Sequence, residues 1–163
     1  MKSMQTHSSD TQGGPLEGPP ARPATRSLRD VLNVTDEFSR AMAGSLSVNA
    51  TDLDAMQHLI MAGPLSPSAL AKRLGLSTAA TTTSIDRLEA LGHVHRSANP
   101  TDRRGVIVAA TDESRARAMS MLMPMIGAVD RVLDEFSADE QEAISAYLRR
   151  VVEVYRTHAD GIR

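Results

Sequence analysis

The residues with the clearest potential for chemistry lie between positions 66 and 108, where basic and hydroxyl side chains are concentrated. Residues 64–108 carry six basic side chains against three acidic ones, a net charge of +3. The flanking residues 1–63 and 109–163 carry net charges of −2 and −3, and the whole chain carries −2. Because a phosphate backbone responds to local charge, this basic island indicates a nucleic-acid partner. Its basic residues are Lys72, Arg73, Arg87, Arg96, Arg103 and Arg104.

The segment from Ser77 to Ser84 contains six hydroxyl side chains among its eight residues. Short hydroxyl side chains let a helix lie close to the floor of the major groove. Threonine methyl groups can meet thymine methyl groups, and the hydroxyls can bond base edges or phosphates. The first backbone amides of such a helix can also hold a phosphate. The alternative interpretation is a helix that is only polar and exposed to solvent.

Two short helices must position these groups. Ser66 caps the first helix, with Pro67 at its first position and Gly75 at its end. Ser77 caps the second helix, which runs from Thr78 to Leu91 before Gly92. Since only Gly75 and Leu76 separate the two helices, the pattern predicts a helix-turn-helix. The inward residues are expected to be Leu70, Leu74, Ile85, Leu88 and Leu91.

A β-hairpin is expected after Gly92, with strands over residues 93–97 and 106–109. The loop between the strands carries Arg103 and Arg104, so the hairpin has the character of a wing whose basic tip contacts DNA. Asp102 and Asp86 are anionic and are interpreted as residues that stiffen the wing, with Asp86 pairing with Arg104.

The flanking segments predict helices with long apolar stripes. Residues 1–24 are rich in proline, glycine and serine and are expected to be a disordered tail. Helices are expected over residues 25–47 and 51–62, and again from about residue 112 to the end, with a new start at the Ser137–Glu140 capping box. The long stripes on these helices predict a second copy of the chain that covers them.

These residues resemble the multiple-antibiotic-resistance regulator (MarR) family. The resemblance spans roughly residues 28–158 and is carried by residues 65–77, by the stretch from Ile85 to Gly92 and by the stretch from Asn99 to Arg104. It implies a mainly α fold of about six helices plus a two-stranded β wing. Residues 25–163 would form one domain, with a DNA-binding lobe at 51–110 and dimerisation helices at 25–50 and 111–163.

The resemblance also implies a ligand-responsive repressor that binds a pseudo-palindromic operator in double-stranded DNA as a homodimer. Family members commonly have an arginine where this chain has Thr83, which shifts the expected base contacts to Thr78, Thr81 and Thr82. The residues expected to contact DNA are Ser66, Lys72, Ser77, Thr78, Ala79, Thr81, Thr82, Thr83, Arg87, Arg96, Arg103 and Arg104.

The effector implied by the resemblance is a small lipophilic or phenolic molecule in a cleft, and no cofactor is expected. Met119, Met121, Met123 and Met125 could line a tolerant pocket, but packed dimer core is the favoured interpretation. The pair His93 and His95 could bind a metal ion if both rings lay on one side of a strand, although the sequence shows no third ligand.

Other classes of function find little support. There is no cysteine, which excludes disulfides and thiol chemistry. No histidine lies in a recognisable catalytic motif, so no enzyme is expected. No apolar run approaches the roughly 18 residues of a membrane span, and residues 1–14 lack the apolar core of a secretory signal, so the expected location is the cytoplasm, at the nucleoid. The competing hypotheses are a winged-helix module that docks a protein and a metal-responsive regulator.

Overall fold

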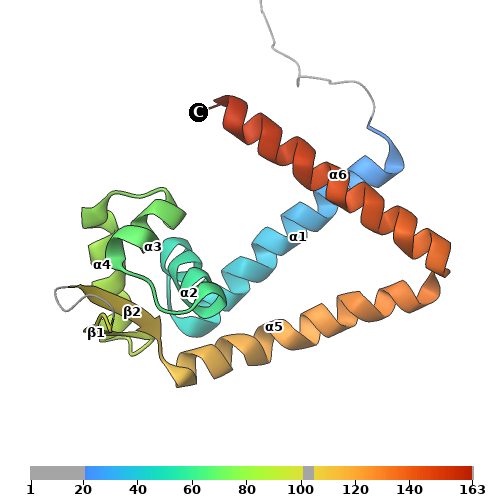
Figure 1. The fold of residues 1–163 in the computed structure, drawn as a ribbon. Coiled ribbons are helices and arrows are strands. Elements are labelled where there is room, and N and C mark those ends of the chain that lie inside the picture. Colours follow the sequence, from blue (N-terminus) through green and yellow to red (C-terminus); the bar gives the residue numbers. More distant parts are fainter. Residues whose placement is uncertain (1–20, 101–104, 163) are drawn as a thin grey trace, which may run out of the picture. The chain divides into compact units, whose positions relative to one another are not determined.

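The computed structural model describes residues 21–100 and 105–162. These residues form six α-helices, one short 3-10 helix and a two-stranded antiparallel sheet (Figure 1). This confirms the predicted fold class. The elements are α1 (Pro23–Leu46), α2 (Ala50–Ala62), α3 (Pro67–Leu74), α4 (Thr78–Ala90), β1 (Val94–Ala98), β2 (Val106–Ala110), α5 (Asp112–Val132), η1 (Leu133–Glu135) and α6 (Ala138–Ile162).

The chain divides into two compact units, residues 1–41 and residues 42–163, with the boundary inside α1. In the first unit the described residues are 21–41, most of which lie in α1. This helix begins at Pro23, so the last residues of the predicted tail are helical. Its apolar side chains Val31, Leu32 and Val34 are exposed by 59, 43 and 60%.

The core of the second unit lies where α2, α3, α4 and the sheet pack together. Helical spacing places one apolar face of each helix toward this core, as the sequence predicts for Leu70, Ile85 and Leu88, which are fully buried. Leu91 was also expected inside, but it follows the last helical turn and is 50% exposed. The largest fully buried apolar residues are Leu46, Met56, Leu59, Leu70, Ile85, Leu88 and Val108.

The helix boundaries follow from side-chain caps. Ser66 Oγ accepts a hydrogen bond from the Ala69 amide and Ser77 Oγ accepts one from the Ala80 amide, both at 3.2 Å, which confirms both predicted caps. Gly75 ends α3 in the left-handed conformation with φ of 65°. At α2 the cap is Asn49, whose side chain accepts from the Asp52 amide at 2.8 Å.

The wing is an antiparallel hairpin in which Arg96 lies opposite Val108. Its first strand begins at Val94, one residue later than predicted, and its second strand begins at Val106 as predicted. Leu65, just before α3, exchanges two backbone hydrogen bonds with Val108, at 3.0 and 2.8 Å. The hairpin is therefore tied to the start of the helix-turn-helix. Asp102, Arg103 and Arg104 lie outside the described residues.

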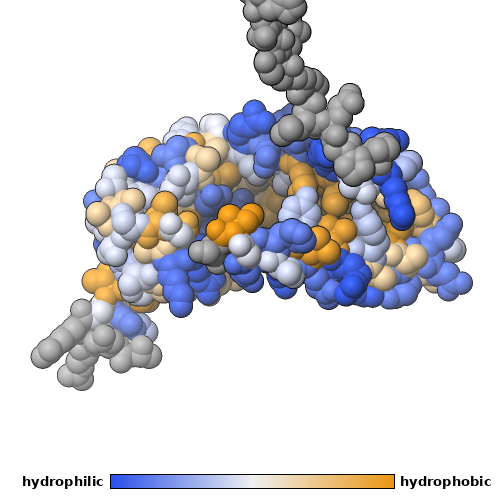
Figure 2. All heavy atoms as spheres, turned by 90° about the horizontal axis from the view of Figure 1, so that it is seen from above, coloured by the Kyte–Doolittle hydropathy of each residue, from blue (hydrophilic) through white to orange (hydrophobic). Residues whose placement is uncertain are grey.

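The last two helices are amphipathic and keep much of their apolar surface exposed. On α5 and η1, Leu133 is half-buried and Val129 is 62% exposed, while Phe136 just beyond them is 39% exposed; α6 buries no residue fully. Figure 2 shows apolar side chains at the surface among hydrophilic ones. No helix in the described ranges is long and apolar enough to cross a membrane.

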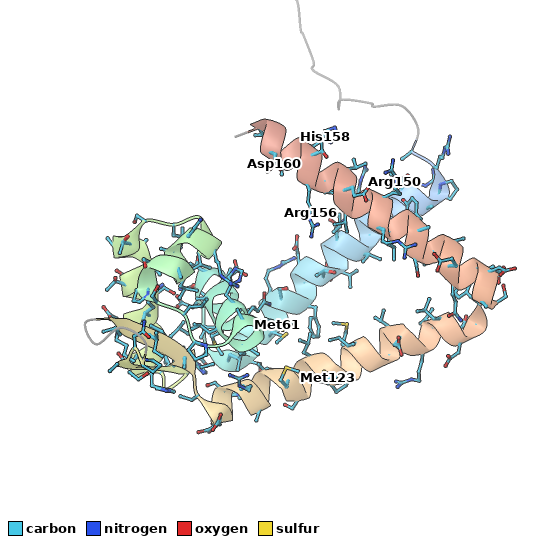
Figure 3. The ribbon with its side chains drawn as sticks, in the orientation of Figure 1. Met61, Met123, Arg150, Arg156, His158 and Asp160 are labelled. Carbon is cyan, nitrogen blue, oxygen red and sulfur yellow. The ribbon has the colours of Figure 1, made fainter. Side chains whose placement is uncertain are left out.

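A predicted capping box starts α6. Glu140 accepts hydrogen bonds from the Ser137 hydroxyl at 2.7 Å and from the Ser137 amide at 2.8 Å, which confirms the prediction. These bonds, the hydroxyl first, lower the pKa of Glu140 below its usual value. Polar side chains continue along the helix, including Arg150, Arg156, His158 and Asp160 (Figure 3).

A buried carboxylate joins α2 to α4. Asp52 is 2% exposed, and its Oδ1 accepts a hydrogen bond from the Ser84 hydroxyl at 2.5 Å. Arg87 donates to both carboxylate oxygens, from Nε to Oδ2 at 3.0 Å and from Nη2 to Oδ1 at 2.8 Å. Since a buried charge is tolerated only when it is paired and hydrogen-bonded, this contact fixes which side of α4 faces α2.

We expect Asp52→Ala to lower the free energy of unfolding by about 2 kcal/mol, because the fully buried Ser84 hydroxyl loses its acceptor. Chemical denaturation measures this change. Asp54→Ala, an exposed residue on the same helix, serves as the matched control and should change stability by less than about 0.5 kcal/mol. Equal effects of the two substitutions would contradict the role given to Asp52.

Candidate nucleic-acid interface

The second helix of the helix-turn-helix, α4, presents a polar face opposite the core. Its buried side is formed by Thr81, Ser84, Ile85 and Leu88. At 3.6 residues per turn, the positions opposite this side are Ala79, Thr83, Asp86 and Ala90, all exposed, which we call the central strip. Its residues are small or polar, so α4 can lie close to a flat or grooved partner.

Thr81 does not belong to this exposed face. Its exposed fraction is 0%, and its hydroxyl donates to the Ser77 carbonyl oxygen at 3.0 Å. The sequence prediction that Thr81 contacts DNA is therefore wrong, because the position falls on the side of α4 that packs into the core. Thr78, Thr82 and Thr83 are exposed as that prediction requires, and so is Ala79.

The exposed threonines are bonded to their own helix. Thr82 Oγ1 donates to the Thr78 carbonyl oxygen at 2.9 Å, and Thr83 Oγ1 donates to the Ala79 carbonyl oxygen at 3.1 Å. Hydroxyls in a helix commonly bond the carbonyl one turn back in this way. These bonds fix the hydroxyl hydrogens and leave the methyl groups and the oxygen lone pairs for a partner.

Arg87, predicted as a phosphate contact, serves first as an anchor. Two of its nitrogens donate to Asp52, and this hydrogen bonding raises the pKa of Arg87 above its usual value. The side chain remains 46% exposed, so the edge of the guanidinium away from Asp52 stays accessible. Contact with a phosphate stays a prediction for this residue.

Arg96 on β1 bridges two acidic residues of α4. Its guanidinium forms ion pairs with Asp86 and Glu89, and its backbone amide also donates to Glu89 at 3.1 Å. Burial lowers the pKa of Arg96, but the hydrogen bonds to these carboxylates outweigh that effect and raise it overall. Asp86 thus ties α4 to the first strand of the wing through Arg96, while a stiffening role stays a prediction and Arg104, the partner named by that prediction, is outside the described residues.

The remaining predicted contacts surround α4. Lys72 and Arg73 are exposed in the last turn of α3. The hydroxyls of Ser66 and Ser77 accept the capping amides described above, so neither is an unused group. The structure thus gathers the predicted residues of α3, α4 and β1 around one lobe, while their contact with DNA stays a prediction.

His93 holds the base of the wing. It is buried, and its Nε2 lies 2.9 Å from the Leu46 carbonyl oxygen while Nδ1 lies 2.7 Å from the Ser114 hydroxyl. A carbonyl only accepts, so Nε2 carries a hydrogen and donates it to Leu46. His95 is exposed. Because one ring is buried and the other exposed, the two do not form the metal-binding pair weighed as an alternative, and the described residues contain no group of three metal-ligating side chains.

Sequence reasoning missed Asp52 and Ser114 as positioning residues. Asp52 shares helical spacing with Ala55, Met56 and Leu59, all of them buried, so a carboxylate on that apolar face was the available signal. Because a buried carboxylate requires a hydrogen-bond donor, a donor side chain on one of the following helices could have been predicted. Ser114 gave no such signal, because its partner lies 21 residues away.

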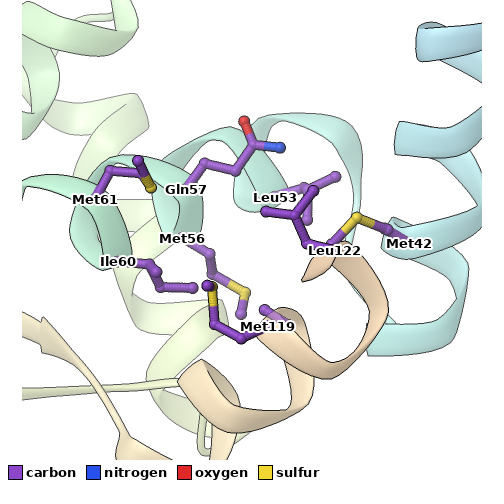
Figure 4. Close-up of a pocket in the computed structure, with 9 residues that line it drawn as sticks. Met42, Leu53, Met56, Gln57, Ile60, Met61, Met119 and Leu122 are labelled. Carbon is purple, nitrogen blue, oxygen red and sulfur yellow. The ribbon is translucent and has the colours of Figure 1, made fainter. Parts of the chain in front are cut away.

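A small apolar cavity lies between α2 and α5, beside the part of α1 that belongs to the second unit. Its volume is about 270 Å³, and Gln57 is the only polar side chain in its lining (Figure 4). Met119 lines this cavity, whereas Met123 on the same helix is 50% exposed (Figure 3). The lining residues are Met42, Leu53, Met56, Gln57, Ile60, Met61, Ala118, Met119 and Leu122.

Solved structures share this fold. The structure of RV1404 from Mycobacterium tuberculosis superimposes with a TM-score of 0.66 at 20% sequence identity, over 85% of this chain and 97% of that one. Wild-type MarR from E. coli in its apo form gives a TM-score of 0.56 at 25% identity, over 81% of this chain and 98% of that one.

The capped helix pair and the hairpin that follows it define a winged helix-turn-helix protein. Residues 46–105 match the sequence model of the MarR family. The HTH-type transcriptional regulator YcgE of Bacillus subtilis is 28% identical over 86% of this chain and 91% of its own length. MarR of Salmonella typhimurium is 31% identical over 58% of this chain and 65% of its own length. The segment of this chain that holds the helix-turn-helix and the wing therefore matches the MarR family, as the sequence resemblance predicts.

We expect Arg96→Gln to loosen the wing, because Asp86 and Glu89 lose the cation that ties them to β1. Amide hydrogen exchange in β1 and β2 should accelerate by about threefold, the scale of a partly exposed ion pair. Exchange in α2 should stay unchanged. Arg73→Gln, an exposed arginine of α3, is the control, and equal acceleration in both variants would contradict the bridging role.

Proposed function

We propose that this protein is a transcription regulator that binds double-stranded DNA sequence-specifically, with α4 in the major groove and the wing beside it. The observation that carries the proposal is the exposed polar face of α4, held by Asp52 within a segment that matches the MarR family. A helix of this kind reads the DNA sequence from the edges of the bases, while basic residues around it contact phosphates. The place of action would be the nucleoid in the cytoplasm.

The proposed active form is a homodimer. The apolar residues Val129, Val132, Leu148, Val152 and Tyr155 are each exposed by between 46 and 62%. Such surfaces favour burial against another chain. A two-fold dimer would place two copies of α4 on one side of the duplex, so the target would be a pseudo-palindrome with half-sites about one helical turn apart.

The proposed regulation is release from the operator when a small lipophilic or phenolic effector binds. The cavity between α2 and α5 supports this proposal, since flexible methionine side chains adapt to apolar ligands of differing shape. The same helix α2 carries Asp52, which holds α4. A shift of α2 upon binding would therefore change the placement of α4, as expected of a repressor that responds to its effector.

The competing proposal is a winged-helix module that docks a protein. A protein partner does not require phosphate contacts, whereas DNA binding releases counterions and weakens as salt rises. The two proposals therefore differ in a measurable way, and the positively charged island of residues 64–108 favours DNA.

We expect the affinity for the protein's own promoter region to fall steeply with salt, in a gel-shift series from 50 to 200 mM salt. Lys72→Gln should weaken binding and reduce the slope of log affinity against log salt by about 1. Gln57→Ala, a position that lines the cavity, should leave the slope unchanged. An affinity that does not change with salt concentration, or no binding to that promoter, would favour the protein-docking alternative.

We expect a lipophilic phenol such as 4-propylphenol to shift the NMR signals of the ε-methyl groups of Met42, Met56, Met61 and Met119, which line the cavity. Protein labelled with carbon-13 at the methionine methyls provides the measurement. Met123 is the internal control, because it does not line the cavity. Shifts at Met123 without shifts at the four lining residues would place the ligand elsewhere.

A further inference from the structure

We propose that Thr83 reads an A·T base pair in the major groove, through its γ-methyl group and the lone pairs of Oγ1. This inference rests on the DNA-binding function proposed above and adds to it the kind of base pair that the helix selects. Its evidence is the position of Thr83 on α4 and the hydrogen bonds made by the residues around it.

Thr83 lies at the centre of the exposed face of α4. It occupies the central strip between Ala79 and Asp86, directly opposite the buried residues that pack into the core. Ala79, one turn earlier, is a short side chain that lets the helix axis come close to a partner. A group that is central and flanked by a small residue is well placed to meet the floor of the groove.

The chemistry that Thr83 offers is restricted by its bond to the helix. Its hydroxyl hydrogen is donated to the Ala79 carbonyl oxygen at 3.1 Å, so the side chain presents a methyl group and a hydrogen-bond acceptor. Asp86, the next residue of the central strip, is also an acceptor and is paired with Arg96. The central strip therefore presents no side-chain donor to a base.

This combination matches one kind of base pair. In the major groove, guanine shows two acceptors, which require a donor from the protein. Cytosine offers an amino donor but has no methyl group. The A·T pair alone combines the amino donor of adenine with the methyl group of thymine. The structure therefore points to A·T at the half-site position that faces Thr83.

The test uses the full-length protein and an operator selected from a random DNA pool. Each thymine of a half-site is replaced in turn by deoxyuridine, which lacks only the methyl group. For the wild type, we expect one such replacement to weaken binding by about fourfold, the effect of one buried methyl group. Thr83→Ser keeps the hydroxyl without the methyl, and it should bind both DNAs equally.

Two variants complete the test. Thr157→Ser removes the same methyl from an exposed threonine of α6 with the same type of bond, to the Glu153 carbonyl oxygen at 3.0 Å, and should retain the fourfold discrimination. Thr83→Val keeps a methyl group at this position and should also retain the fourfold discrimination. It shows that a substitution at position 83 is compatible with folding and DNA binding, should the Thr83→Ser chain fail to fold.

The outcomes separate the inference from the function on which it rests. Loss of discrimination in Thr83→Ser alone supports the inference. Equal binding of thymine and deoxyuridine DNA by the wild type overturns it, as does discrimination that persists in Thr83→Ser. Absence of salt-sensitive DNA binding by the wild type would instead overturn the proposed function.

Discussion

The buried carboxylate of Asp52 is the constraint on which the rest of the lobe depends. An ionised group that is 2% exposed must be bonded on every side, and Ser84 and Arg87 supply three hydrogen bonds to it. Ser84 lies on the buried side of α4 and Arg87 at its margin, so the contact sets the rotation of that helix about its own axis. The outward position of Thr83 follows directly. A change of pairing at Asp52 would therefore alter the exposed face of α4 without substituting any residue of that face.

The distribution of apolar surface gives a second constraint. Within the described residues, the buried apolar core comes from α2, α3, α4, the sheet and the end of α1, with Ala118 of α5, whereas α6 buries no residue fully. A 25-residue helix that keeps Leu148, Val152 and Tyr155 about half exposed is poorly stabilised by its own chain. Our proposal of a homodimer accounts for these stripes, because a second copy would supply the surface that they lack.

Local features were predictable from the sequence because their causes are local. Ser66 and Ser77 cap helices through amides only three residues away, and Gly75 takes the left-handed conformation that its position requires. The same holds for the Ser137 capping box. Each of these depends on residue type and short spacing, so composition and pattern were sufficient.

Features that depend on packing between distant residues were predicted less well. Thr81 was counted as exposed because of its polar residue type, although it lies four residues before Ile85 and seven before Leu88, on the helix face that packs into the core. His93 was grouped with His95, although its partners, Leu46 and Ser114, are 47 and 21 residues away. Asp86 was assigned Arg104, which lies outside the described residues, and the partner that the structure shows is Arg96 on β1.

Helix α2 has a consequence for how such a protein can diversify. One of its faces holds Asp52 and the core residue Met56, while Gln57 and Met61 reach the cavity from positions that are exposed. Substitutions at Gln57 and Met61 can therefore alter which small molecules fit, without disturbing the anchor of α4. Under the proposed function, ligand preference and operator preference could then change separately during evolution, although a single helix of 13 residues would serve both.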